Sequence, residues 1–297
     1  MSASAPVVGA VGGRSVRKRR PASAGSPGRS SGQSKGQSLG RGSGLGLGIA
    51  MIWFSLLVLI PLAAVVVKAA GGGWETFGDA VTNRQTLAAL RLTVLTSVGV
   101  TALNMVMGTV IAWVLVRDRF PGKAILDLVI DIPFALPTIV AGLVLLSLYG
   151  PNSPVGVHAS NTRLAVFLAI AFVTLPFVVR TVQPVLEEME RDVEDAAASL
   201  GAGRLTTFRR VILPTLVPAI FAGAALSFAR GISEYGSLVL LSGNLPYRTE
   251  VTSVRMLSYL EGGDTASAAA VATIMLVVAL LAIVSLDLIQ RRVARRG

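Results

Sequence analysis

The sequence of 297 residues contains no cysteine and a single histidine, His158. Disulfides, thiolate metal sites and thiol-attached haem are therefore excluded, and one imidazole cannot form a cluster of metal ligands. Charged residues are also scarce, at 14%, whereas 53% of the residues are apolar and the mean hydropathy is +0.68. This composition is too apolar for an ordinary soluble domain. We therefore expect a bilayer protein without a catalytic constellation, and hence not an enzyme.

The apolar residues form six runs, each long enough to cross roughly 30 Å of hydrocarbon as a helix. They cover residues 45–67, 92–116, 125–149, 164–182, 212–241 and 268–289. The sequence thus predicts an all-α integral membrane protein with six transmembrane helices. The first run follows basic residues as a signal peptide does, but its apolar core is too long for one, so we interpret it as an uncleaved span.

The net charge of +11 is distributed unevenly between the two sides of the predicted bundle. If the N-terminus is cytoplasmic, twenty Lys and Arg residues fall on the cytoplasmic side, six fall outside and Arg230 lies within a span. The positive-inside rule favours this arrangement. We therefore expect a multi-pass protein of the plasma (inner) membrane with both termini in the cytoplasm. Because the basic residues are spread between spans, we expect contact with membrane lipid and none with nucleic acid.

Residues 1–43 are rich in Gly, Ser, Pro and Arg and have almost no large apolar side chains. This composition predicts a disordered, basic cytoplasmic tail, followed by a transmembrane domain over residues 44–297. The basic cluster at residues 17–20 fits an orientation signal as well as contact with an anionic partner, and we assign it no specific partner.

The only sizeable polar segment between spans covers residues 180–212, on the predicted cytoplasmic side. It contains Asp195-Ala196-Ala197, three residues, Gly201, nine residues, and then Val211-Ile212-Leu213-Pro214. Small side chains let another protein approach closely. Gly201 can adopt the positive φ that ends a helix, and Pro214 is expected to interrupt the next one. Acidic residues before Gly201 and basic residues after it suit two short helices with a break.

This spacing resembles the "EAA" signature of bacterial ABC importer permeases, with Asp195 in place of Glu and Val211 in place of Ile. In that family the loop is a coupling helix set into a groove of a separate ATPase. The resemblance implies contacts through Asp195, Ala196, Ala197 and Gly201, with Val211, Leu213 and Pro214 completing the motif. The chain contains no P-loop of its own. ATP and Mg²⁺ would be used by two copies of an ATPase subunit, and this chain would bind no cofactor.

Further segments are similar to sulfate/thiosulfate permeases of the CysT type, over about residues 45–292. They are residues 131–138, 141–142, 176–188, 226–230, 234–236 and 249–253. The resemblance implies the type I ABC importer permease fold, transport by alternating access, a second permease subunit of the CysW type and an extracytoplasmic sulfate-binding protein. Molybdate permeases look similar in several of these places. A molybdate/tungstate permease and an ion-coupled secondary transporter therefore stay open as alternatives.

Ionisable side chains within a span usually face the bundle interior or a pathway, because charge at membrane depth is costly. Arg230 and Glu234 are four residues apart, on one helical face. They predict either an ion pair that locks the helix or, with Ser227 and Ser233, part of a path for a dianion. Thr138 could line the same path or bond back to a carbonyl of its own helix.

Asp127 and Asp131 also share a helical face, in the third predicted span. Two carboxylates without further oxygen or imidazole ligands make a poor metal site, so we predict no bound metal. Pro133 and Pro137 remove backbone donors from the same span and predict a bent or broken helix there.

Overall fold

The computed structural model describes residues 41–294, and 82% of these residues are helical, with no strand among them. These residues form two units that divide after Ile52. The predicted tail 1–43 lies outside the described residues except for its last three, which begin the helix α1 (Arg41–Phe54). This helix continues through a π segment, η1 (Ser55–Leu59), into α2 (Ile60–Gly71).

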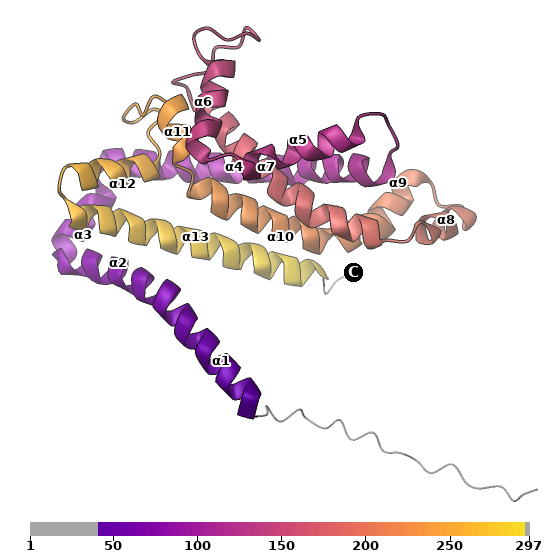
Figure 1. The fold of residues 1–297 in the computed structure, drawn as a ribbon, viewed down its shortest axis with the longest axis horizontal. Helices are drawn as coiled ribbons and strands as arrows, with labels where there is room; N and C mark the ends of the chain where they lie inside the picture. The colour runs from indigo at the N-terminus through magenta and orange to yellow at the C-terminus, as the bar shows by residue number, and fades with distance from the viewer. Residues whose placement is uncertain (1–40, 295–297) are drawn as a thin grey trace, which may run out of the picture. The chain divides into compact units, whose positions relative to one another are not determined.

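Four long helices form the core of the second unit (Figure 1). They are α4 (Arg84–Arg117), α7 (Arg163–Glu188), α10 (Leu213–Ile232) and α13 (Thr265–Ala294). The first three pack on one another, and α13 packs on α10 and on α2. Buried apolar side chains of α4, α7 and α10 fill one cluster around Val179, Leu186 and Leu216, and a second cluster lies around Val166 and Ile170.

Shorter helices occupy the ends and one side of this bundle. They are α3 (Gly73–Thr82), α5 (Lys123–Ala135), α6 (Thr138–Tyr149), α8 (Arg191–Ser199), α9 (Arg204–Thr207), the π segment η2 (Phe208–Ile212), α11 (Gly236–Leu241) and α12 (Thr252–Glu261). Figure 1 shows α8 and α9 at one end of the bundle and α3 and α12 at the other.

Five described helices are long and apolar enough to cross a membrane, and α5 with α6 forms a sixth span if this bent pair is counted as one. The predicted all-α, six-span class is confirmed on that count. The third span is not straight, because the chain bends by 119° between α5 and α6. The break falls at Leu136, whose extended backbone (ψ 132°) precedes Pro137. A residue before proline avoids the helical region, so Pro137 breaks the helix, whereas Pro133 lies within α5.

The prediction for the fifth span was wrong at both ends. The helix begins at Arg204, passes through η2 and ends at Ile232, so residues 236–241 form a separate helix, α11. Pro214 does not interrupt it, contrary to the prediction. Pro214 is the second residue of α10, directly after the wider turns of η2, and the chain stays helical through it. The π turns of η2 directly before Pro214 accommodate its missing N–H without ending the helix.

The two breaks, between α5 and α6 and between α10 and α11, lie against each other. A side chain on Gly236, the first residue of α11, would overlap the hydroxyl of Thr138, the first residue of α6. Only glycine permits this approach, and α6 and α11 pack together along their lengths. The fold therefore joins two discontinuous helices at their broken ends.

Candidate functional site

The polar loop that carries the EAA-like spacing is shorter than its predicted bounds of 180–212. Helix α7 continues to Glu188, because its apolar face still packs on the core at Val182 and Leu186. On the other side the helix of α9, η2 and α10 begins at Arg204. The connection between the long helices is therefore residues 189–203, which contain α8.

Gly201 ends this short helix in the predicted left-handed conformation, with φ +82°. Its N–H donates to the carbonyl of Ala198 at 2.9 Å, and the N–H of Ala202 donates to Ala197 at 3.0 Å. These bonds close the C-terminus of α8 and turn the chain toward α9. The expected break at Gly201 is thus present, but the segment after it is continuous with α10 rather than a separate short helix.

The turn exposes an apolar and small-residue surface at the end of the bundle. Leu200 is 89% exposed, and Val193 and Leu205 are also exposed. Asp195 and Ala196 are exposed on α8, whereas Ala197 is half-buried. The turn therefore presents exposed apolar side chains on an otherwise polar loop.

The second half of the motif is fixed to the core instead. Val211 lies in η2, and Leu213 and Pro214 open α10. Between them Ile212 is 2% exposed and packs in the same cluster as Leu216. The motif therefore has an exposed half, around Gly201, and an anchored half that leads into a long helix.

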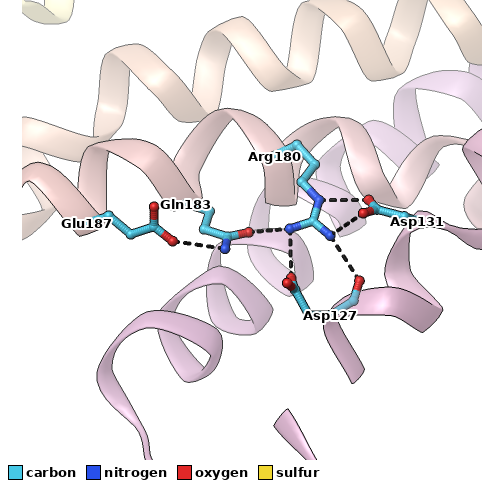
Figure 2. A network of polar contacts seen from close by, with 5 residues as sticks. All are labelled: Asp127, Asp131, Arg180, Gln183 and Glu187. Atoms are coloured by element: carbon cyan, nitrogen blue, oxygen red, sulfur yellow. Dashed lines mark hydrogen bonds and ion pairs between the residues drawn. The ribbon is translucent and has the colours of Figure 1, made fainter. Parts of the chain in front are cut away.

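Arg180 forms the centre of an ion-pair network between α5 and α7 (Figure 2). Its Nη1 lies 2.7 Å from Oδ1 of Asp127, and its Nη2 lies 2.7 Å from Oδ2 of Asp131. Its Nε also donates to Asp131 Oδ1 at 2.7 Å, and Nη2 donates to the carbonyl of Asp127 at 2.9 Å. Gln183 accepts from Nη1 at 2.6 Å and donates to Glu187 at 3.0 Å. The two carboxylates considered above as metal ligands thus bind one guanidinium.

Sequence reasoning missed this network because it assigned Arg180 to the cytoplasmic loop. The signal that could have found it was the pair of acids on one face of the neighbouring apolar run, since two carboxylates at membrane depth require a cation.

Arg230 and Glu234 form the predicted ion pair, with 2.9 Å between Nη2 and Oε2. The Glu234 residue is only 1% exposed. Its other oxygen, Oε1, accepts from the Ser237 N–H at 2.9 Å and from the Ser237 hydroxyl at 2.8 Å. The carbonyl of Glu234 accepts from the hydroxyl of Ser253 at 2.7 Å. Glu234 therefore joins α10, α11 and α12 at the break after Ile232.

The remaining residues predicted for a substrate path do not share one environment. Ser227 is buried between helices, where its hydroxyl accepts from the Asn104 amide at 3.2 Å. The same amide donates to Thr174 at 2.8 Å, which links α4, α7 and α10. Ser233 is exposed, and its hydroxyl donates to the carbonyls of residues 229 and 230. Thr138 packs against Gly236 and starts its helix, so it has no preceding turn of α6 to bond back to.

Comparison with known proteins shows which family this chain belongs to. The family described as "Binding-protein-dependent transport system inner membrane component" matches residues 104–296. The sulfate transport system permease protein CysT of Salmonella typhimurium is 43% identical over 83% of this chain and 92% of its own. The CysT protein of Synechocystis is 42% identical over 82% of this chain and 87% of its own. The chain belongs to the CysT-type ABC permeases.

The solved structures support the fold of this CysT-type permease. A bacterial alginate ABC transporter, in complex with a pentasaccharide-bound periplasmic protein, aligns with a TM-score of 0.71 at 18% identity. The alignment covers 84% of this chain and 94% of that chain. It confirms the ABC importer permease fold that the sequence predicted.

Proposed function

We propose that this CysT-type permease is the membrane subunit of an ATP-driven importer that moves sulfate or thiosulfate into the cytoplasm by alternating access. The curated relatives at 42–43% identity are named sulfate transport system permease proteins, which supports the substrate class. The fold supplies the spans and two discontinuous helices, a feature found where transporters bind anionic substrates within the bilayer.

The exposed turn after α8 is the observation that supports coupling of this transport to ATP hydrolysis. Leu200, at 89% exposure, stands beside Gly201 on a polar loop at one end of the bundle. Burying it in a groove of an ATPase would remove its apolar surface from water. Asp195, Ala196, Ala197 and Gly201 would form the contact, and Val211, Leu213 and Pro214 would pass the movement into α10.

The proposal requires several partners. Two ATPase subunits would bind ATP and Mg²⁺, because the sequence holds no P-loop and we assign this chain no cofactor. One chain supplies half of a pathway, so a second permease of the CysW type would complete it. An extracytoplasmic sulfate-binding protein would deliver the substrate. With the ATPase in the cytoplasm, both termini of this chain would be cytoplasmic as well.

The broken ends of the helices are our candidate for the substrate path. The side chain of Arg230 is 31% exposed and, within residues 41–294, its guanidinium is paired with one carboxylate, so further N–H groups can contact a dianion. Glu234 would weaken that contact enough for release. Thr138 and Ser233 lie at the same breaks, whereas Ser227 would hold α10 in place from the helix interface.

The test is uptake of radiolabelled sulfate by a strain that lacks its own sulfate permease and carries this gene. We expect uptake, co-purification of an ATPase in mild detergent, and roughly tenfold or greater loss of both with Gly201→Asp. Gly73→Asp is the matched control, because Gly73 and Gly201 share a positive φ of +82° and open space around them, and Gly73 begins α3, at the opposite end of the bundle.

Two outcomes would redirect the proposal. Strong competition by molybdate without rescue of growth on sulfate would favour the molybdate/tungstate permease. Uptake that survives Gly201→Asp, with no ATPase recovered, would favour an ion-coupled carrier.

A further inference from the structure

The last residue of α4, Arg117, contacts both the end of α7 and the middle of α8, the helix that leads into the exposed turn. Its Nη2 lies 2.7 Å from Oε1 of Glu194 in α8, and it donates to the carbonyl of Met189, at the end of α7, at 3.2 Å. The Arg117 side chain is 10% exposed and that of Glu194 is 27% exposed. The pair is therefore largely shielded from water, where an ion pair is screened less than at the surface.

Helix α8 buries little of its surface against the bundle in the described part of the chain. No α8 residue whose exposure the structure describes is buried, Arg191 being outside that description. An open pocket of about 500 Å³ separates it from the end of α4, lined by Arg117, Glu194, Arg204 and Phe208 among others. Dense packing therefore does not fix α8 against α4, and the contact from Glu194 to Arg117 spans the gap instead.

The Arg117 side chain is itself held by aromatic neighbours. Its guanidinium lies 6.0 Å from the ring centroid of Trp113, one turn earlier in α4. Trp113 in turn meets the ring of Phe208 in η2 edge-on, with 5.7 Å between centroids. The end of α4 thus contacts the end of α7, α8 and the start of the helix that becomes α10.

We propose that Arg117 is a positioning residue that ties α8 to α4, so that a displacement imposed on the exposed turn moves α4. This inference rests on the proposed function, because it assumes that an ATPase moves α8. It adds a second route into the bundle beside the covalent one through α10. Helix α4 runs 34 residues and packs on both α7 and α10, so movement of its end reaches the whole core.

The test uses the full importer in proteoliposomes, with ATP hydrolysis and sulfate uptake measured on the same preparation. We expect Arg117→Ala and Glu194→Gln to lower the sulfate moved per ATP by roughly tenfold while hydrolysis stays within about twofold of wild type. Arg117→Lys keeps the charge and should retain most of the coupling. Asp192→Asn is the matched control, because Asp192 is an exposed acid on the same helix.

A covalent tether separates positioning from folding of the loop. The chain contains no cysteine, so Arg117→Cys with Glu194→Cys introduces the only two thiols. A short bismaleimide that joins them should restore the sulfate moved per ATP, whereas the untethered double variant should stay uncoupled. Restoration by a link without charge is a result that a purely electrostatic role would not give, and retained ATPase binding by the untethered double variant would exclude a folding role.

Two results would overturn the proposal. One is an unchanged ratio of sulfate to ATP in both Arg117→Ala and Glu194→Gln. The other is loss of ATPase binding in these variants that the tether does not reverse, which would reduce the pair to a folding contact. A wild-type complex that binds no ATPase would instead contradict the proposed function itself, which distinguishes that failure from a failure of the contact between Arg117 and Glu194.

Discussion

At the scale of single residues, Arg180 shows how one cation attaches α5, the first half of the bent third span, to the bundle. Helix α5 has one buried side chain, Ile130, so apolar packing alone holds it weakly. Arg180 adds ion pairs to both Asp127 and Asp131, which are 44% and 47% exposed at their side chains. Such exposure weakens each pair, but the shared guanidinium fixes both carboxylates in one geometry.

We expect Arg180→Ala to lower the free energy of unfolding by about 1–2 kcal/mol, because two carboxylates then lose their common donor and must be hydrated separately. In a detergent-solubilised thermal melt this corresponds to a fall of a few degrees. Arg84→Ala is the control, since Arg84 is an exposed arginine at the start of α4. Equal melting temperatures for the two variants would show that α5 is held by packing alone.

The sequence indicated the acids of this network but not their partner. Asp131 and Asp127 lie 49 and 53 residues before Arg180, and nothing in local spacing connects residues so far apart. Arg230 and Glu234 were paired correctly from their separation of four residues, which keeps the two side chains close although Glu234 lies two residues beyond the end of α10. Contacts within a helix can be predicted from its period, whereas contacts between helices depend on the fold.

At the scale of the helices, one of the two breaks was predictable from local sequence and the other was not. Pro137 predicted the break between α5 and α6, because proline restricts the backbone of the residue before it. The break between α10 and α11 contains no proline and follows a continuous apolar run, so hydropathy alone predicted one span over 212–241. Glu234 is the feature that marks it, because its buried carboxylate bonds the first turn of α11.

The start of α13 offers a test of a helix cap outside the spans. Asp264 precedes the helix and accepts from the Ser267 N–H at 3.0 Å, as a capping residue does. Bonds from the Ser267 side chain and backbone hold the pKa of the Asp264 carboxyl below its ordinary value. The carboxylate therefore adds stability that is complete above the unfolded pKa, near 4, and is lost as the pH falls through the lower folded pKa.

We expect Asp264→Ala to cost about 0.5–1 kcal/mol at pH 6, and this cost to shrink as the pH falls toward 3, because the wild-type carboxyl then becomes protonated too. Thermal melts of both proteins across this range measure the difference. Glu261→Ala, at the exposed last residue of α12, is the control and should change little at either pH. A cost that stays constant with pH would show that the charge of Asp264 contributes nothing.

At the scale of the whole chain, composition and apolar run length were sufficient for the class and the number of spans. Those properties depend on the thickness of the bilayer and on the need to pair backbone polar groups within it. Both constraints apply to every membrane-spanning sequence, whatever its fold. The ends of the spans were harder to predict, because helices extend into polar sequence where one face still packs. Helix α7 continues to Glu188 for this reason, although its apolar run ends near residue 182.

The orientation of the chain can be tested directly, because a sequence without cysteine allows single thiols to be placed at will. Helix α7 has 26 residues and so is about 39 Å long, enough to cross the hydrocarbon core. Asn152 lies in the loop before it and Ser199 at the end of α8 after it, and both are exposed. We expect a membrane-impermeant maleimide applied to intact spheroplasts to label Asn152→Cys but not Ser199→Cys, and inside-out vesicles to reverse the result. Labelling of Ser199→Cys from outside would place the Gly201 turn beyond the reach of any cytoplasmic ATPase.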